Sequence, residues 1–186
     1  MKVTLRRVGL FGGTFDPPHL GHEAALSDAW ASGCFDEIVV TVAGDPYLKS
    51  HEGVITPAVR RLGMAQAAFA ALPGVRVSAM EIERSGPTYT IDTVRELLTP
   101  DVALTLILGA DVVPQLVRWR EAETLASMVT LYVLPRGEEV VSIPAGWRGI
   151  IASMEPVDLS STLTRERLEN GENPSGLVPE AVIPLL

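Results

Sequence analysis

A turn rich in glycine and proline constrains the fold of this chain more than any other stretch. The turn, GGTFDPPHLGH, occupies residues 12–22 and follows an apolar run at residues 8–11. After it, apolar residues recur at helical spacing as far as Trp30. The pattern therefore predicts a strand, a tight turn and a helix, as in the first half of a βαβ unit.

The composition of this turn predicts a site for phosphate. Gly12 and Gly13 allow the backbone to approach a ligand closely, and the start of the following helix directs unpaired N–H groups towards it. His19 and His22 share one face of the helix start, and Gly21 between them leaves room for a bulky ligand. A single histidine here would most often be a cap or a packed ring. Two histidines in one glycine-rich turn favour binding or catalysis.

The remaining sequence continues the alternation of strand and helix. We expect strands at residues 37–42, 75–80, 102–108, 129–134 and 149–154, and helices at residues 20–32, 57–72, 91–98, 163–169 and from residue 179, with short helical stretches on either side of Trp119. Such alternation is typical of a parallel sheet with helices on both faces. Because no linker divides the 186 residues, we predict a single α/β domain with a Rossmann-like, doubly wound parallel sheet.

Charge and hydropathy restrict the partners and the compartment. A net charge of −8 argues against nucleic acid and against an anionic membrane surface as partners, so an anionic substrate would need a local positive site. No stretch approaches the roughly 20 apolar residues of a membrane span, and no apolar run of signal-peptide length follows the basic residues 1–7, so we expect no signal peptide. The single cysteine, Cys34, excludes an internal disulfide. We therefore expect a cytoplasmic protein.

A second phosphate-type site is predicted near the end of the chain. Ser160, Ser161 and Thr162 stand at the start of a predicted helix, and Arg165 follows one turn later. Hydroxyl groups, free N–H groups and a guanidinium on one small patch suit phosphate oxygens. Alone, this pattern would more often be an N-cap beside a solvated arginine. Its occurrence with the first turn in the same chain favours phosphate binding.

The first turn resembles the (His/Thr)-x-Gly-His signature of the nucleotidylyltransferase superfamily, and its longer form resembles bacterial nicotinate mononucleotide adenylyltransferases in particular. Three further segments resemble the same family: GPTYTIDT at residues 86–93, GAD at residues 109–111 followed by Trp119, and LSSTLTR at residues 159–165. The four motifs occur in the family's order and together cover nearly the whole chain. The resemblance implies the nucleotidylyltransferase type of the Rossmann-like fold.

The resemblance also implies a reaction and a set of site residues. The reaction is adenylyl transfer from ATP to nicotinate mononucleotide, in NAD biosynthesis, with Mg²⁺ delivered by the ATP. The implied catalytic residues are His19, His22 and Arg165. The implied ATP- and phosphate-binding residues are Gly12, Gly13, Thr14, Phe15, Gly21, Asp111, Ser160, Ser161 and Thr162. The implied mononucleotide-binding residues are Lys49, Thr88, Tyr89, Thr90 and Trp119, with the tryptophan stacked on the nicotinate ring.

Some of these residues have simpler explanations in the sequence itself. Trp119 could belong to the core, Asp111 could cap a helix, and Lys49 could be solvated in its loop. The chain also departs from the family, because residues 45–49 lack the common Pro-Pro-His-Lys form, Thr164 replaces an isoleucine, and no aromatic tail follows the last helix. The exact mononucleotide and the oligomeric state, for which a homo-oligomer is one option, therefore stay open.

Three alternative functions can be weighed against this one. Another adenylyl acceptor, such as nicotinamide mononucleotide, phosphopantetheine or a sugar or alcohol phosphate, is disfavoured by residues 86–90 and Trp119, which suit a pyridine ring. A non-catalytic nucleotide-binding protein is disfavoured by the intact histidines and Arg165. A dehydrogenase is disfavoured because the turn is not Gly-x-Gly-x-x-Gly and no acidic residue ends the second strand.

Overall fold

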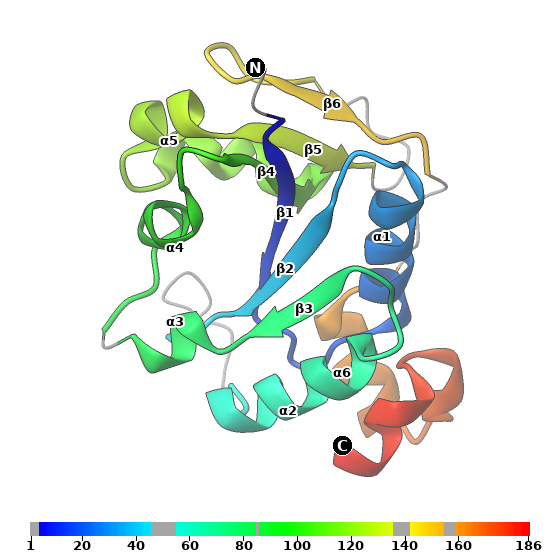
Figure 1. The fold of residues 1–186 in the computed structure, drawn as a ribbon. Helices are drawn as coiled ribbons and strands as arrows, with labels where there is room; N and C mark the ends of the chain where they lie inside the picture. Colours follow the sequence, from blue (N-terminus) through cyan, green and yellow to red (C-terminus); the bar gives the residue numbers. More distant parts are fainter. Residues whose placement is uncertain (1–3, 46–54, 85, 136–141, 155–158) are drawn as a thin grey trace.

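Six parallel strands form the centre of the computed structural model, which describes residues 4–45, 55–84, 86–135, 142–154 and 159–186. All five strand pairings are parallel (Figure 1). The predicted doubly wound α/β sheet is therefore confirmed. In sheet order, the strands are β3 (Val75–Ser78), β2 (Glu37–Val42), β1 (Arg6–Gly13), β4 (Val102–Gly109), β5 (Thr130–Leu134) and β6 (Gly149–Ile151).

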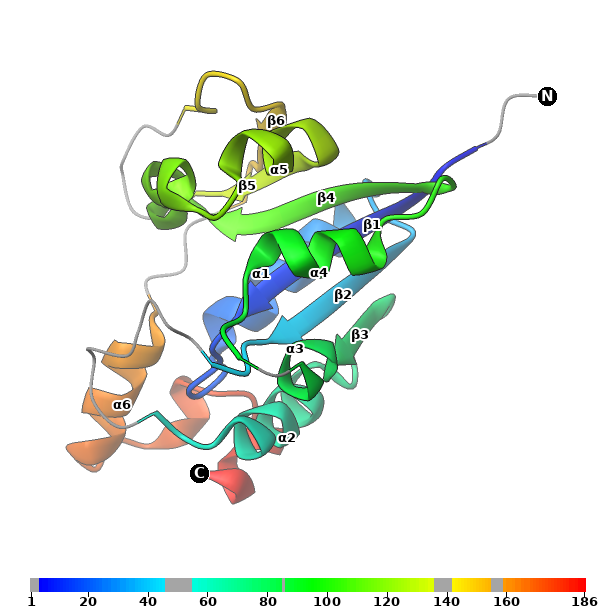
Figure 2. The same cartoon turned by 90° about the vertical axis from the view of Figure 1, so that its left-hand side faces the viewer.

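Helices cover both faces of this sheet (Figures 1 and 2). One face carries α1 (Leu20–Ala31), α2 (Ala58–Phe69), α6 (Ser161–Glu169) and the 3₁₀ helices η3 (Pro174–Gly176) and η4 (Glu180–Leu185). The other face carries α4 (Thr90–Leu97), the 3₁₀ helix η2 (Ala110–Arg118) and α5 (Ala122–Met128), while α3 (Met80–Glu83) follows the end of β3. Within the described ranges, none of the helices has both the length and the apolar character needed to cross a membrane.

The strands bury side chains on both faces, which explains why their apolar runs in the sequence are continuous. Ile38, Val39 and Val40 of β2 are all 0% exposed. Ile38 and Val40 pack in the cluster that includes α1 and α2, whereas Val39 packs in the cluster that includes α4 and η2. The sheet is therefore held by an apolar core on each of its faces. Each such buried side chain contributes roughly 1.5–3 kcal/mol to the stability of the fold.

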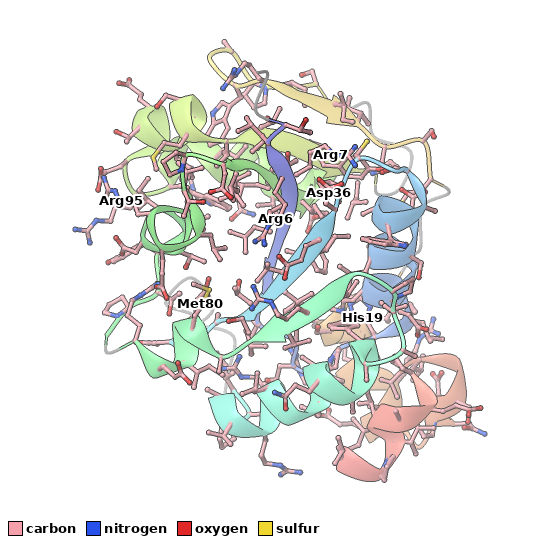
Figure 3. All side chains as sticks on the ribbon, viewed as in Figure 1. Arg6, Arg7, His19, Asp36, Met80 and Arg95 are labelled. Atoms are coloured by element: carbon pink, nitrogen blue, oxygen red, sulfur yellow. The ribbon has the colours of Figure 1, made fainter. Side chains whose placement is uncertain are left out.

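A surface ion pair ties the amino ends of β1 and β2 (Figure 3). Arg7 donates to the Asp36 carboxylate through its guanidinium at 2.6 Å and through its backbone N–H at 2.8 Å. These hydrogen bonds lower the pKa of Asp36 to about 2. The pair lies at the end of the sheet opposite the glycine-rich turn, so that turn depends on other contacts.

Several predicted boundaries are wrong: the strand expected at residues 149–154 ends at Ile151, the helix expected at residues 57–72 ends at Phe69, and three further differences follow. The strand expected at residues 75–80 ends at Ser78, whose Oγ accepts the backbone N–H of Met80 at 3.3 Å as the chain turns into α3. Pro57, expected as the first residue of α2, is its N-cap. The helix expected after residue 179 is a 3₁₀ helix that contains Pro184, which lacks the N–H that an α-helix would use.

Gly74, between α2 and β3, should not tolerate alanine. Its φ of +67° lies in the left-handed region, and an added Cβ would collide with the ring of Trp30. Gly74→Ala should lower the free energy of unfolding, measured by urea denaturation, by more than the roughly 1–2 kcal/mol that the left-handed conformation alone costs. Gly33→Ala is the matched control, because Gly33 has a φ of +68° and no atom within 4 Å of an added Cβ. Equal losses in the two variants would show that the collision with Trp30 contributes nothing.

Candidate active site

A cleft of about 570 Å³ lies at the carboxyl ends of the central strands β1 and β4. These strands are neighbours in the sheet, but the chain leaves β1 towards β2 and leaves β4 towards β5. No crossover therefore covers the space between them, and open parallel sheets bind their ligands at such a point. Twelve of the predicted site residues line the cleft: Gly12, Gly13, Thr14, Phe15, His19, Gly21, His22, Thr88, Thr90, Asp111, Trp119 and Ser161.

His19 and His22 stack on each other at the start of α1, with His19 on the α1 side of the sheet (Figure 3). Their ring centroids are 3.6 Å apart, and His19 is 4% exposed. The Nδ1 of His22 accepts the backbone N–H of His19 at 3.1 Å. In neutral His22 this hydrogen bond places the ring proton on Nε2, which is then the donor nitrogen. Both rings line the cleft at the amino end of a helix, where the peptide dipoles favour an anion.

The glycines of the turn give space to neighbouring side chains. A Cβ at Gly13 would lie 2.7 Å from the Phe15 ring, and a Cβ at Gly21 would lie 3.0 Å from Nδ1 of His19. Phe15 is 1% exposed, and its ring centroid lies 4.9 Å from that of His22. The Phe15 side chain therefore supports His22, and its backbone is the part suited to a phosphate. The room predicted for a ligand at Gly21 is taken up first by the imidazole of His19.

The second phosphate motif packs directly against this turn. From α6, Ser161 Oγ donates to the carbonyl of Pro17 at 3.1 Å, and Arg165 Nη1 donates to the carbonyl of Asp16 at 2.6 Å. Ser160 is the N-cap of α6 and accepts a backbone N–H through its side chain. The fold thus brings together two motifs that the sequence separates by more than two thirds of the chain.

The other members of this motif stand beside the cleft and outside its lining. Arg165 Nη2 donates to Thr162 Oγ1 at 3.3 Å. Thr164, which occupies the position of an isoleucine in the family, is 0% exposed, and its hydroxyl donates to the carbonyl of Ser160 at 2.8 Å. The hydroxyl that this replacement introduces into the core is therefore paired.

Asp111 lies at the start of η2 and lines the cleft. The N-cap of η2 is Gly109, so Asp111 does not act as the cap of this helix. Asp111 is also exposed to solvent, and an added Cβ at Gly109 would collide with its carboxylate. Asp111 is therefore not the N-cap residue of η2, and a contact with ribose hydroxyls remains a prediction.

Two buried groups that line the cleft, Thr88 Oγ1 and Trp119 Nε1, have no hydrogen-bond partner among the residues that the structure describes. Leaving such a group unpaired costs about 1–3 kcal/mol, so a ligand that bonded to it would recover that energy.

Tyr89 is not part of the lining, because its ring packs under the guanidinium of Arg120, whose Cζ is 4.6 Å from the ring centroid. Lys49 lies outside the described residues.

Glu81 of α3 also lines the cleft, and no pattern in the sequence predicted it. It is 7% exposed, and burial raises the pKa of its carboxyl above the ordinary value. Thr93 Oγ1 donates to Glu81 at 2.8 Å, and Arg84 donates to Thr93 at 3.2 Å and to Glu96 at 2.6 Å. These bonds join α3 to α4 and so position the segment between them, which contains the predicted mononucleotide-binding residues.

Comparison with known proteins assigns the chain and its fold to one class. The family model described as cytidylyltransferase-like matches residues 10–167. The structure of a nicotinic acid mononucleotide adenylyltransferase of Plasmodium falciparum complexed with NaAD aligns with a TM-score of 0.78 over 97% of this chain and 94% of that one, at 18% sequence identity. At this identity the likeness shows the shared fold. The chain belongs to the cytidylyltransferase-like family.

Sequence relatives narrow this class. Proteins named probable nicotinate-nucleotide adenylyltransferase from Gemmatimonas aurantiaca and from Thermus thermophilus are each 39% identical to this chain. The alignments cover 95% of this chain in both cases, 87% of the first protein and 94% of the second. Within the wider class, the chain is therefore a member of the nicotinate-nucleotide adenylyltransferase family, as its four motifs predicted.

Glu81 should make the stability of the protein depend on pH. Because its pKa is raised in the folded state, the folded chain binds more protons than the unfolded chain between the ordinary pKa of 4.5 and the raised value. Stability should therefore fall as the pH rises through this window. Glu81→Gln keeps an oxygen that can accept the Thr93 hydroxyl and removes the titration. The difference between the free energy of unfolding of Glu81→Gln and that of wild type, measured in urea, should therefore change in favour of the variant as the pH rises from 4.5 towards neutrality.

The matched control is Glu83→Gln, at an exposed position of the same short helix. Its difference from wild type should change less with pH than that of Glu81→Gln. A difference between wild type and Glu81→Gln that stayed constant over this pH range would contradict the prediction.

Proposed function

We propose that this chain transfers the adenylyl group of ATP to nicotinate mononucleotide, forming nicotinate adenine dinucleotide and pyrophosphate in NAD biosynthesis. The observation that carries the proposal is the direct contact between the turn at the start of α1 and the start of α6, beside a cleft that also contains Thr88 and Trp119. The turn and the start of α6 suit the phosphates of ATP. The part of the cleft that contains Thr88 and Trp119 suits a small aromatic acceptor. The names of the sequence relatives support the same activity.

The reaction depends on positioning and not on proton removal. The 5′-phosphate of the mononucleotide is ionised at neutral pH and can attack the α-phosphorus of ATP without a general base. As the new P–O bond forms, the bond from the α-phosphorus to the bridging oxygen breaks, and pyrophosphate leaves with the additional negative charge. Groups that align the two substrates and stabilise this charge therefore supply the catalysis.

His19 and His22 would donate hydrogen bonds to the ATP phosphates from the start of α1, His22 through its Nε2. Arg165 and the start of α6 would hold the leaving pyrophosphate, since they contact the same turn. In the described part of the chain, no group of three or more His, Cys, Asp or Glu side chains is arranged to hold a metal ion. We assign Mg²⁺ to the MgATP substrate, because in such sites this ion is usually held through substrate phosphates with one or two carboxylates.

On the acceptor side, we assign Trp119 to stacking on the pyridine ring, and Thr88 and Thr90 to the rest of that pocket, because all three line the cleft. Asp111 would contact nucleotide ribose hydroxyls from the start of η2. Lys49 remains a proposed contact of the mononucleotide, on the strength of the family resemblance.

His22→Ala should lower kcat by at least about 10²-fold, which is the usual loss when one donor to a transition state is removed. The measurement is pyrophosphate release at saturating ATP and nicotinate mononucleotide, with circular dichroism to confirm that the variant is folded. Turnover equal to that of wild type would remove His22 from the mechanism.

His22→Asn separates the two roles of this ring. The Oδ1 of asparagine can accept the backbone N–H of His19, as Nδ1 of His22 does at 3.1 Å, but asparagine is too short to replace Nε2. Activity as low as that of His22→Ala would assign the loss to the Nε2 donor. Recovery of wild-type kcat with asparagine would show that His22 acts only by capping α1.

Nicotinate mononucleotide should be preferred over its amide by at least about tenfold in kcat/KM, equivalent to about 1.4 kcal/mol. Trp119 Nε1 is a donor only, and the Thr88 hydroxyl and the N–H groups near it can also donate. Hydrogen bonds from donors to a carboxylate are about twice as strong as neutral ones, whereas a carboxamide NH₂ facing donors leaves both sides unpaired. Equal use of the two mononucleotides in the pyrophosphate assay, or better use of the amide, would contradict this assignment.

Variants of Trp119 test which property of the ring is used. Trp119→Ala should raise the KM for the mononucleotide more than it lowers kcat, because it removes the stacking face. Trp119→Phe keeps a flat ring without the N–H, so it should recover most of the affinity and lose part of the preference for the acid. Trp147→Phe is the control, since this tryptophan packs against the same apolar cluster outside the cleft lining.

A further inference from the structure

Arg61, in α2, is the largest of the almost fully buried side chains in the described part of the chain, and it is 1% exposed. Its guanidinium donates to three backbone carbonyls, those of Thr56 at 2.7 Å, Thr14 at 2.7 Å and Gly44 at 3.3 Å. Thr14 belongs to the first turn, Gly44 follows β2, and Thr56 precedes α2. One side chain therefore holds three separate segments together next to the cleft.

The charge of Arg61 is not paired with a carboxylate by any hydrogen bond or ion pair among the described residues. Asp16 attracts it electrostatically, but the Asp16 carboxylate accepts the backbone N–H of Thr56 at 3.1 Å. Burial outweighs this attraction and lowers the pKa of Arg61, although a guanidinium stays protonated at neutral pH. Carbonyl dipoles stabilise this cation without cancelling its charge, so an anion bound nearby would neutralise it.

The hydrogen bond to Thr14 also orients a particular peptide group. The Thr14–Phe15 peptide is trans, so its N–H points away from the carbonyl that Arg61 holds. Within the described ranges, the Phe15 N–H makes no hydrogen bond, and both residues line the cleft. A carbonyl bonded to a cation polarises the peptide to which it belongs, which makes the N–H at its other end a stronger donor.

We propose that Arg61 is a positioning residue for the phosphates of ATP. By fixing the Thr14 carbonyl, it directs the Phe15 N–H towards a phosphate oxygen, and its buried charge adds to the attraction for that oxygen. The bonds to Gly44 and Thr56 hold the guanidinium itself in place, so Arg61 acts on the substrate through the turn and without touching it. This inference rests on the proposed use of ATP by the same site.

Two substitutions of Arg61 and one of its neighbour provide the test. Arg61→Lys keeps the charge, but an ammonium cannot span three carbonyls as a planar guanidinium does. Arg61→Met removes both the charge and the donors. Arg60→Met is the matched control, because Arg60 is exposed on the same helix and donates only to the carbonyl of Leu185, at 3.2 Å. For each variant, the KM for ATP, the KM for nicotinate mononucleotide and the melting temperature are measured.

Arg61→Lys should raise the KM for ATP about tenfold or more and the KM for the mononucleotide much less, and Arg61→Met should have a larger effect in the same direction. Arg60→Met should leave both constants close to wild type. A KM for ATP unchanged in Arg61→Lys, or an equal rise in both constants, would overturn the inference. If wild type released no pyrophosphate with ATP and any mononucleotide, the proposed function itself would fail, and the two failures are therefore distinguishable.

A measurement on the wild-type protein covers the case in which the Arg61 variants do not fold. A non-hydrolysable ATP analogue is added to ¹⁵N-labelled protein, and the amide proton of Phe15 is followed by NMR. A downfield shift on binding is expected, because a new hydrogen bond to a phosphate oxygen deshields the donor proton. Saturation of the site with no movement of the Phe15 amide proton would overturn the proposed orientation of this peptide.

Discussion

The turn between β1 and α1 cannot satisfy its own backbone, and the rest of the site depends on how that backbone is satisfied. The carbonyls of Thr14, Asp16 and Pro17 belong to no helix or strand, and the two prolines of the turn lack N–H groups. Side chains from distant elements supply the donors: Arg61 is 47 residues from its acceptor, Ser161 is 144 and Arg165 is 149. The turn is therefore held by α2 and α6, which the fold brings to it from distant parts of the chain.

The same contacts explain how a chain with a net charge of −8 can attract an anionic substrate. Several surface arginines, such as Arg7, Arg76 and Arg95, are paired with carboxylates that cancel their charge. Arg61 and Arg165 instead donate to backbone carbonyls of the turn. A carbonyl is a dipole with no formal charge, so these hydrogen bonds do not neutralise the two guanidinium groups, although the nearby Asp16 carboxylate offsets part of the charge of Arg61. Guanidinium charge beside the cleft would favour an anionic substrate even in an acidic protein.

The strand and helix pattern and both phosphate motifs could be predicted from the sequence, because periodicity, glycines and helix caps have local causes. Arg61 and Glu81 could not be predicted, because packing between distant segments sets their roles. Arg60 and Arg61 are adjacent in one helix and look alike in the sequence, yet only Arg61 is buried. Phe15 shows the opposite case: its motif predicts contact with ATP, but its ring packs in the core, which leaves its backbone for that contact.

The two parts of the cleft differ in how their polar groups are satisfied, and this difference gives the site a direction. Around the turn, two guanidinium groups and the Ser161 hydroxyl are bonded to carbonyls, and the guanidinium groups bring positive charge. Elsewhere in the cleft, Thr88 Oγ1 and Trp119 Nε1 lack partners within the described residues, although Glu81 in the same lining is bonded to Thr93. We assign the triphosphate to the charged part, where Coulombic attraction is strongest, and the ring substituent of the acceptor to the neutral donors. With the substrates ordered in this way, the acceptor phosphate would lie between the two parts, where an in-line attack requires it.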